Sequence, residues 1–222
     1  IDLGFAYLEL PGHNLGIVDV PGHQDFVKNM VAGVGAVDLA LLVVAADDGW
    51  MPQTEEHLQI LSYLGVTRGV VALTKADLVQ DTTVRVKEIS DQLRNSPFFG
   101  ADIIPVSTKT GAGLDDLKTA LTTVVDQIPP HENHNQPRLA VDRIFTVQGI
   151  GTVATGTLTG GTLQKGQTVL THPPGRETRV RGLQSHNREQ EVAQPGTRTA
   201  INLAGLSRDA VPRGATITLP EL

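Results

Sequence analysis

Apolar segments that alternate with amphipathic segments constrain the fold of this chain more strongly than any other feature of its sequence. The apolar segments are short and unbroken, which indicates buried strands, whereas the others repeat their apolar residues at the helical spacing. Alternation of this kind is typical of a parallel sheet that helices cover on both faces. We therefore predict an α/β domain with strands at 39–46, 69–74 and 102–106 and with helices at 25–35, 53–64, 82–94 and 113–127.

The tripeptide Pro-Gly-His occurs twice near the N-terminus, at residues 11–13 and 21–23. The first copy lies between two strand-like segments, 1–10 and 15–20, and its turn-forming residues predict the tip of a β-hairpin. The second copy follows Asp19, which closes a hydrophobic strand. The two copies therefore have different predicted surroundings, and only the second is a candidate for chemistry.

A change in sequence character near residue 128 divides the chain. The segment "IPPHENHNQP", residues 128–137, holds three prolines and no apolar period, which indicates a linker between domains. After it, short alternating segments separated by Gly and Pro predict a small antiparallel β-barrel. We expect the α/β domain at 1–128, the linker at 129–137 and the barrel at 138–222.

The distribution of charge supports this division. Residues 1–135 carry 8 Lys and Arg against 18 Asp and Glu, whereas residues 136–222 carry 10 against 6, so the two domains are expected to have different partners. The longest apolar run has eight residues, fewer than the roughly 20 that cross a membrane. The chain has no cysteine, which excludes disulfides and thiolate metal sites. Because no signal-peptide pattern opens the chain, we expect a cytoplasmic protein without membrane contact.

Polar residues follow three of the predicted strands, and ligands of α/β sheets bind beyond these carboxyl ends. The first group is "DVPGH", in which Asp19 can hold Mg²⁺ directly or through its water. Gly22 leaves its backbone N–H open to a terminal phosphate, and His23 can orient an attacking water. The alternative is an Asp-Pro-Gly turn followed by a solvated histidine.

The second group is "TKAD", which ends the strand at 69–74. The Asp77 carboxylate can accept two hydrogen bonds from guanine, while the Lys75 stem lies over the base. The alternative is a helix N-terminus that the aspartate caps. The third group is Ser107, Thr108 and Lys109, which follow the strand at 102–106. Backbone N–H groups in this loop can meet the carbonyl oxygen of the base. The alternative is an ordinary Ser/Thr loop before a helix, without a ligand.

Residues 19–61 and the following "LTKADL" together resemble the G domain of the translational GTPases. The sequence from residue 128 onward resembles the second-domain barrel of the same family, with "GIGTVATGTLTGG" as its signature hairpin. Within the family, three features are most similar to the selenocysteine-specific elongation factors. They are "IDLGFAYLEL", Thr74 in place of the usual Asn, and "LAVDRIFTVQGIGTVATGT". The expected fold is therefore part of a P-loop GTPase G domain followed by a β-barrel.

The resemblance implies GTP or GDP as ligand, Mg²⁺ as cofactor and GTP hydrolysis as the activity of the whole protein. It assigns Asp19 to the magnesium ion, Gly22 to the γ-phosphate and His23 to the catalytic water. It assigns guanine specificity to Thr74, Lys75 and Asp77. It assigns the loop behind the base to Ser107, Thr108 and Lys109.

The barrel of this family holds the aminoacyl end of tRNA, and the resemblance implies selenocysteinyl-tRNA as the partner. A selenol is more acidic than a thiol and arrives as an anion, which cationic side chains recognise. Asp142, Arg143 and Arg198 are the candidates for this pocket. The alternative is a surface pair of Asp142 with Arg143, worth little energy, and a solvated Arg198. Contact with RNA phosphates fits the excess of basic residues in the barrel.

The family pattern also places segments outside this chain. No G-x-x-x-x-G-K-[ST] phosphate loop occurs in the 222 residues, and the pattern puts it before Ile1. A third barrel and winged helices that bind an mRNA element would follow Leu222, and the whole protein would act on the ribosome as a monomer. The strand of the phosphate loop would separate 15–20 from 39–46, which leaves these strands about 9.6 Å apart. We expect this chain alone to be poorly stable and not to hydrolyse GTP.

Two other functions stay open on the sequence. The first is a general aminoacyl-tRNA elongation factor of the Tu type, and winged helices after a third barrel would favour the selenocysteine factor over it. The second is a non-catalytic RNA-binding adaptor built on a degenerate G domain, and a phosphate loop upstream would favour the enzyme over it.

Overall fold

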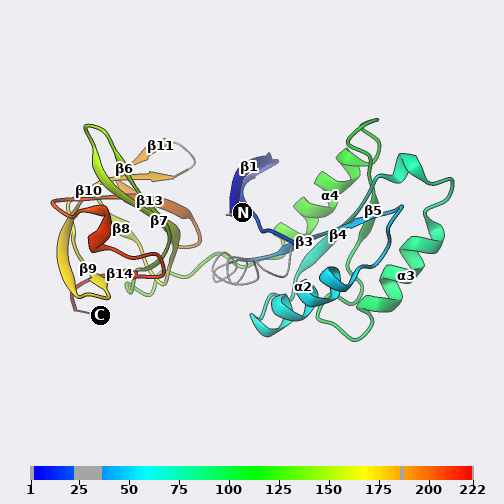
Figure 1. Cartoon of the computed structure of the whole chain (residues 1–222), viewed down its shortest axis with the longest axis horizontal. Coiled ribbons are helices and arrows are strands. Elements are labelled where there is room, and N and C mark those ends of the chain that lie inside the picture. Colours follow the sequence, from blue (N-terminus) through cyan, green and yellow to red (C-terminus); the bar gives the residue numbers. More distant parts are fainter. Residues whose placement is uncertain (1–2, 23–36, 186–187, 222) are drawn as a thin grey trace. The chain divides into compact units, whose positions relative to one another are not determined.

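The computed structural model describes residues 3–22, 37–185 and 188–221, and the chain divides into two compact units (Figure 1). The first unit comprises Ile1–Pro129 and the second Pro130–Leu222. The helix that we expect at 25–35 lies outside the described residues. No helix among the residues described is long and apolar enough to span a membrane.

The first unit contains a three-stranded parallel sheet in the order β3-β4-β5. All three predicted strands are present, with β5 shorter than expected at both ends. Hydrogen bonds nevertheless continue past β5, because the N–H of Val106 donates to the carbonyl of Leu73 at 2.8 Å. The bounds are β3 (Ala40–Ala45), β4 (Gly69–Thr74) and β5 (Ile103–Pro105).

Helices cover both faces of this sheet, as the alternating pattern predicts. Along β4, Val71 and Leu73 belong to a core cluster with α2 and α3, whereas Val70 belongs to a second cluster with α4. Successive side chains of a strand point to opposite faces, so α4 lies on the face opposite α2 and α3. The bounds are α2 (Pro52–Tyr63), α3 (Thr83–Leu93) and α4 (Leu114–Val125), each within two residues of the prediction.

A two-residue turn joins β1 (Gly4–Leu10) to β2 (His13–Asp19), and the two strands pair antiparallel. The predicted hairpin is therefore confirmed. Only the Pro-Gly part of the first Pro-Gly-His forms the turn, with Gly12 at a φ of +78°. His13 already begins β2, and its Nε2 lies 2.7 Å from Oδ1 of Asp126, just after α4. The second strand therefore starts two residues earlier than predicted.

The hairpin is a sheet of its own. Among the described residues, β2 pairs with β1 and not with β3, and β3 pairs only with β4. This agrees with the expectation that the two strands are not neighbours. On the face of the sheet that α4 covers, β3 is partly exposed, and Val43 is 61% exposed.

The second unit is a closed antiparallel barrel of six strands, as predicted. Its order is β10-β13-β7-β6-β14-β9, and pairing of β9 with β10 closes the ring. A strand β11 (Arg188–Gln190) extends β10, while β8 (Leu163–Gln164) pairs with β12 (Val192–Ala193). The six bounds are β6 (Arg138–Val147), β7 (Gly151–Thr159), β9 (Thr168–His172), β10 (Arg176–Ser185), β13 (Arg198–Leu203) and β14 (Thr216–Thr218).

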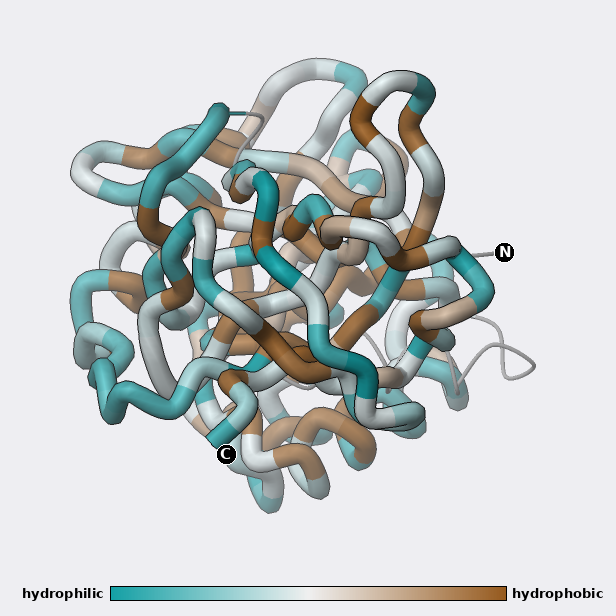
Figure 2. The backbone as a smooth tube through the Cα atoms, turned by 90° about the vertical axis from the view of Figure 1, so that its left-hand side faces the viewer, coloured by the Kyte–Doolittle hydropathy of each residue, from teal (hydrophilic) through white to brown (hydrophobic). Residues whose placement is uncertain are grey.

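Alternating apolar residues fill the barrel interior, which explains why so short a chain can form a core. Leu139, Ile201 and Ile217 are fully buried in one cluster. Figure 2 shows brown, hydrophobic stretches of the backbone interspersed with teal, hydrophilic ones. Gly156 of the signature hairpin lies so close to β6 that a Cβ would collide with the carbonyl oxygen of Ala140.

The segment 129–137 contains neither helix nor strand. Its second half is nevertheless attached to the barrel, because the N–H groups of His134 and Gln136 both donate to the carbonyl of Gly160 at 3.0 Å.

Candidate functional site

The carboxyl ends of β3, β4 and β5 lie side by side, and each continues into a polar loop. The N–H of Ala46 donates to the carbonyl of Thr74 at 2.8 Å, and the N–H of Ala76 donates to the carbonyl of Val106 at 3.1 Å. These bonds hold the loops 46–49, 75–77 and 107–111 at one edge of the sheet. The second and third predicted groups are therefore neighbours.

Thr74, the last residue of β4, links this strand to β3 through its side chain. Its Oγ1 donates a hydrogen bond to the carbonyl oxygen of Val44 at 3.3 Å. A hydroxyl has only one O–H to donate, so Thr74 makes a single brace here. The residue thus supports the strand end rather than reaching into the loop beyond it.

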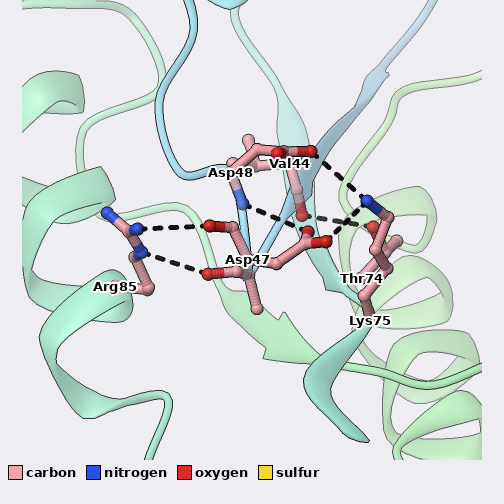
Figure 3. Close-up of polar contacts among 7 residues, drawn as sticks. Val44, Asp47, Asp48, Thr74, Lys75 and Arg85 are labelled. Atoms are coloured by element: carbon pink, nitrogen blue, oxygen red, sulfur yellow. Dashed lines mark hydrogen bonds and ion pairs between the residues drawn. The ribbon is translucent and has the colours of Figure 1, made fainter. Parts of the chain in front are cut away.

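Lys75 has an unusual backbone and a fixed side chain. Its φ is +56°, which is rare for a residue other than glycine. Its Nζ lies 2.9 Å from Oδ2 of Asp47 and 3.3 Å from Oδ2 of Asp48 (Figure 3). The hydrogen bond from Lys75 is the main cause that lowers the pKa of Asp47, and the bond to Asp47 is the main cause that raises the pKa of Lys75.

Arg85, on α3, anchors the loop that carries the two aspartates. Its Nε donates to the carbonyl of Ala46 at 3.1 Å, and its Nη2 donates to the carbonyl of Asp47 at 3.5 Å. Its Nη1 bonds Oε2 of Glu88 at 2.6 Å, so the guanidinium is held from both sides. Sequence analysis does not identify Asp47, Asp48 or Arg85. The one signal for the aspartates is their place directly after a predicted strand.

Asp77 lies in the short 3₁₀ helix Ala76–Leu78, with its side chain exposed. The residue that precedes this helix is Lys75, and no side chain caps the helix. The alternative of an aspartate cap therefore fails. Within the described part of the chain, the carboxylate of Asp77 has no hydrogen-bond partner.

The loop after β5 is built around Ser107, which is buried. Its Oγ accepts the N–H of Thr110 at 3.2 Å, and its carbonyl accepts the N–H of Gly111 at 2.9 Å. Thr108 and Lys109 lie exposed at the tip. Of the three residues expected behind the base, Ser107 thus shapes the loop, while the other two are open to solvent.

The first predicted group is only partly described. Asp19 ends β2 with its side chain exposed, and Gly22 follows shortly after. A Cβ on Gly22 would lie 3.9 Å from Cε1 of His57, so this histidine of α2 is next to the glycine. Burial is the main cause that lowers the pKa of His57. His23 lies outside the described residues.

The exposed carboxylate of Asp19 suits Mg²⁺, which takes oxygen ligands and typically binds through one or two carboxylates, substrate phosphates and water. The edge that carries Asp77 suits a ligand with paired N–H donors, because the exposed carboxylate offers two acceptor oxygens without a partner among the described residues. No group of three or more His, Asp or Glu that could hold a metal occurs among the described residues.

In the barrel, Arg198 and Asp142 form a nearly buried pair. Nη2 of Arg198 lies 2.8 Å from Oδ1 of Asp142, and Nε lies 3.2 Å from Oδ2. Thr155 completes the cluster, since its Oγ1 donates to Oδ1 of Asp142 at 2.7 Å and accepts from Nη2 of Arg198 at 3.0 Å. The side chains of Arg198 and Asp142 are only 16% and 11% exposed.

A break in strand pairing places Asp142 in this cluster. The register of β6 against β7 shifts between Val141 and Arg143, so Asp142 is an extra residue on β6. The alternative drawn from the sequence is therefore wrong: Asp142 pairs with Arg198, and Arg198 is not solvated. Arg143 is exposed beside them.

Comparison with known proteins decides the family. Residues 1–130 match the family model described as "Elongation factor Tu GTP binding domain", and residues 151–218 match "Elongation factor Tu domain 2". The chain belongs to the elongation factor Tu family. Its α/β unit and its barrel thus correspond to two matched domains of this family.

Within the elongation factor Tu family, the selenocysteine-specific elongation factor of Desulfomicrobium baculatum is 48% identical over the whole chain. The factor of the same name from Escherichia coli K12 is 42% identical over 96% of the chain. Elongation factor 1-alpha of Methanopyrus kandleri is 34% identical over the whole chain, which covers 58% of that protein. The chain spans 35% of the length of the two selenocysteine-specific relatives.

Solved structures of the family show the same fold. A bacterial selenocysteine-specific elongation factor, EF-Sec, is 36% identical and matches with a TM-score of 0.94 over all of this chain and 38% of its own. The elongation factor SelB of Methanococcus maripaludis, in complex with the GTP analogue GppNHp, is 30% identical. It matches with a TM-score of 0.93 over all of this chain and half of its own.

Proposed function

We propose that the chain is the guanine-binding and tRNA-holding part of a GTP-hydrolysing elongation factor that delivers selenocysteinyl-tRNA to the ribosome. The observation that carries the proposal is the junction of the "TKAD" and Ser107–Lys109 loops at one sheet edge, with the Asp77 carboxylate exposed and unpaired in the described chain. The identity of 48% with a selenocysteine-specific factor supports the choice of partner.

Guanine recognition is assigned to the two loops after β4 and β5. Asp77 accepts two hydrogen bonds from the N1–H and the exocyclic amine of guanine, which adenine cannot donate in the same pattern. The Lys75 stem covers the base and its ammonium points to the ribose. Thr74 holds the strand end through Val44. Ser107 shapes the loop, since its own N–H donates to the carbonyl of Ala112 at 3.0 Å, and the loop presents the N–H groups of Thr108 and Lys109 to the base carbonyl.

The phosphate end is assigned to the residues after β2. Asp19 would hold Mg²⁺ through a magnesium-bound water, and the ion would neutralise charge on the phosphates. Gly22 donates its backbone N–H to the γ-phosphate, since it has no side chain to block the approach. His23 orients the attacking water.

The barrel is assigned to the aminoacyl end of the tRNA. Asp142 and Thr155 fix the Arg198 guanidinium through the distances given above, and a fixed cation recognises a selenolate with little loss of conformational freedom. Arg143 adds a second cation next to this cluster. The excess of 10 Lys and Arg over 6 Asp and Glu after residue 135 favours contact with RNA phosphates.

The setting of the whole protein is part of the same proposal. We infer a monomer that acts in the cytoplasm on the ribosome, with an mRNA element bound by domains outside this chain. The general elongation factor is the second candidate, but its relatives in the comparison are less similar, at 34% identity against 48%.

Two titrations test the proposal in a form of the protein that includes a phosphate loop. Fluorescent GDP is expected to bind and to be displaced by GTP but not by ATP. The same tRNA, esterified to selenocysteine or to serine, is expected to bind the GTP form with affinities that differ by about tenfold or more, as one charge-assisted contact allows. Absence of nucleotide binding would favour the non-catalytic adaptor, whereas equal tRNA affinities would favour the general factor.

A further inference from the structure

Two acidic side chains from the loop after β3 hold the ammonium group of Lys75. The distances are 2.9 Å to Asp47 and 3.3 Å to Asp48, and the side chains are 46%, 34% and 59% exposed, in the order Lys75, Asp47 and Asp48. Neither aspartate belongs to the residues assigned above to the nucleotide. Figure 3 shows both carboxylates directed at the lysine from the β3 side.

The loop that carries these aspartates is itself braced. The N–H of Gly49 donates to the carbonyl of Ala45 at 2.8 Å, and Oδ1 of Asp47 accepts the N–H of Asp48 at 3.1 Å. Arg85 binds the carbonyls of Ala46 and Asp47 from α3. A Cβ at Gly49 would collide with the Arg85 guanidinium, so the arginine is packed closely against the loop. The carboxylates therefore occupy a defined place on the scaffold.

Lys75 is fixed at its other end by its backbone. The carbonyl of Lys75 accepts the N–H of Leu78 at 3.0 Å, which closes the turn that presents Asp77. The backbone of Lys75 has a left-handed φ of +56°, which is rare for a residue other than glycine. The backbone and the ion pair together restrict a four-carbon stem that would otherwise have many rotamers.

Exposed ion pairs add little to folding stability, so the effect of this pair is expected in binding rather than in folding. A lysine already ordered before the ligand arrives loses less conformational entropy when it covers the base. We propose that Asp47, with Asp48 as the weaker second contact, is a positioning residue that sets the Lys75 side chain for guanine-nucleotide binding. This inference rests on the proposed function, because it assigns Lys75 to the base and ribose.

Substitution of Asp47 tests the inference in a form of the protein that includes a phosphate loop. Asp47→Asn is expected to raise the Kd for fluorescent GDP by between about twofold and tenfold, the cost of immobilising one flexible side chain. Asp91→Asn is the matched control, since it removes one negative charge from another exposed ion pair, with Arg94 at 2.6 Å. The control is expected to bind GDP like the wild type.

A double-mutant cycle shows whether Asp47 acts through Lys75. Lys75→Met keeps an unbranched stem without the charge, and Asp47→Asn is expected to have no further effect on the GDP Kd in that background. Asp47→Glu, which keeps the charge, is expected to recover most of the affinity and serves as the second variant if the Asn variant unfolds. The difference between wild type and Asp47→Asn is also expected to shrink near 1 M salt, where the screening length is about 3 Å.

The outcomes separate the inference from the proposed function. If the wild type binds GDP and Asp47→Asn binds it equally well, the inference is overturned and the guanine site stands. If Asp47→Asn weakens binding by the same factor in the Lys75→Met background, the aspartate acts elsewhere and the inference is again overturned. If the wild type binds no guanine nucleotide, both fall together.

Discussion

Arg198 binds both carboxylate oxygens of Asp142, at 2.8 Å and 3.2 Å, and thereby links β13 to an extra residue on β6, past the intervening strand β7. The shared contact with Thr155 leaves the carboxylate well satisfied at 11% exposure. A pair with this geometry fixes the direction of the guanidinium, which under the proposed function would meet the selenolate. The cluster therefore makes a prediction for tRNA binding.

Arg198→Lys is expected to abolish the preference of the protein for selenocysteinyl-tRNA over the same tRNA esterified to serine. A lysine ammonium cannot form the two parallel bonds to Asp142, so the cation loses its fixed direction. The barrel is also expected to lose about 2 kcal/mol of unfolding free energy, because a nearly buried carboxylate loses part of its pairing. Filter binding and urea unfolding measure the two effects. Arg188→Lys, an exposed strand residue, is the control, and a preference that survives Arg198→Lys would remove Arg198 from the site.

Asp77→Asn is expected to change base preference from guanine to xanthine nucleotides. An amide can donate to the additional carbonyl of xanthine, whereas it no longer accepts both hydrogen bonds from guanine. Competition of GDP and XDP against a fluorescent nucleotide measures the change. An unaltered GDP Kd in the variant would show that Asp77 does not contact the base.

His23→Ala is expected to leave GTP binding intact and to slow ribosome-stimulated hydrolysis by about 10²-fold or more, the scale of a positioned acid-base or water-orienting group. The reason is that nucleotide affinity depends on the base and phosphate contacts, whereas turnover depends on the orientation of the water. Single-turnover release of phosphate measures the rate. Unchanged turnover would identify the second Pro-Gly-His as a turn.

His57 is expected to make the α/β unit less stable as the pH falls. Burial lowers its pKa, and the nearby charge of Glu56 opposes this to a smaller extent. The unfolded chain therefore takes up a proton first, and stability is lost as the pH drops from the ordinary value of 6.5 toward the lower folded pKa. Urea unfolding at pH 7.5 and 5.5 measures this change. It should be smaller in His57→Gln, and an equal change in both proteins would contradict the assignment.

Much of the candidate site follows from local pattern. The apolar runs before Asp47, Lys75 and Ser107 mark strand ends, and parallel strands bring such ends to one edge, so the meeting of the "TKAD" and Ser107–Lys109 loops could be predicted. The same reasoning could not show which charged groups pair there. Weak stability of the isolated chain and its failure to hydrolyse GTP stay predictions.

The sequence by itself determined the order and type of the elements, because hydrophobic period and turn residues act over a few neighbouring positions. Only the tertiary structure decided the pairs that give the site its geometry. Lys75 meets Asp47 across 28 positions and Arg198 meets Asp142 across 56. Such contacts depend on strand order, on register and on one extra residue in β6. A shift of one residue in a strand turns every side chain to the other face, so no local pattern contains them.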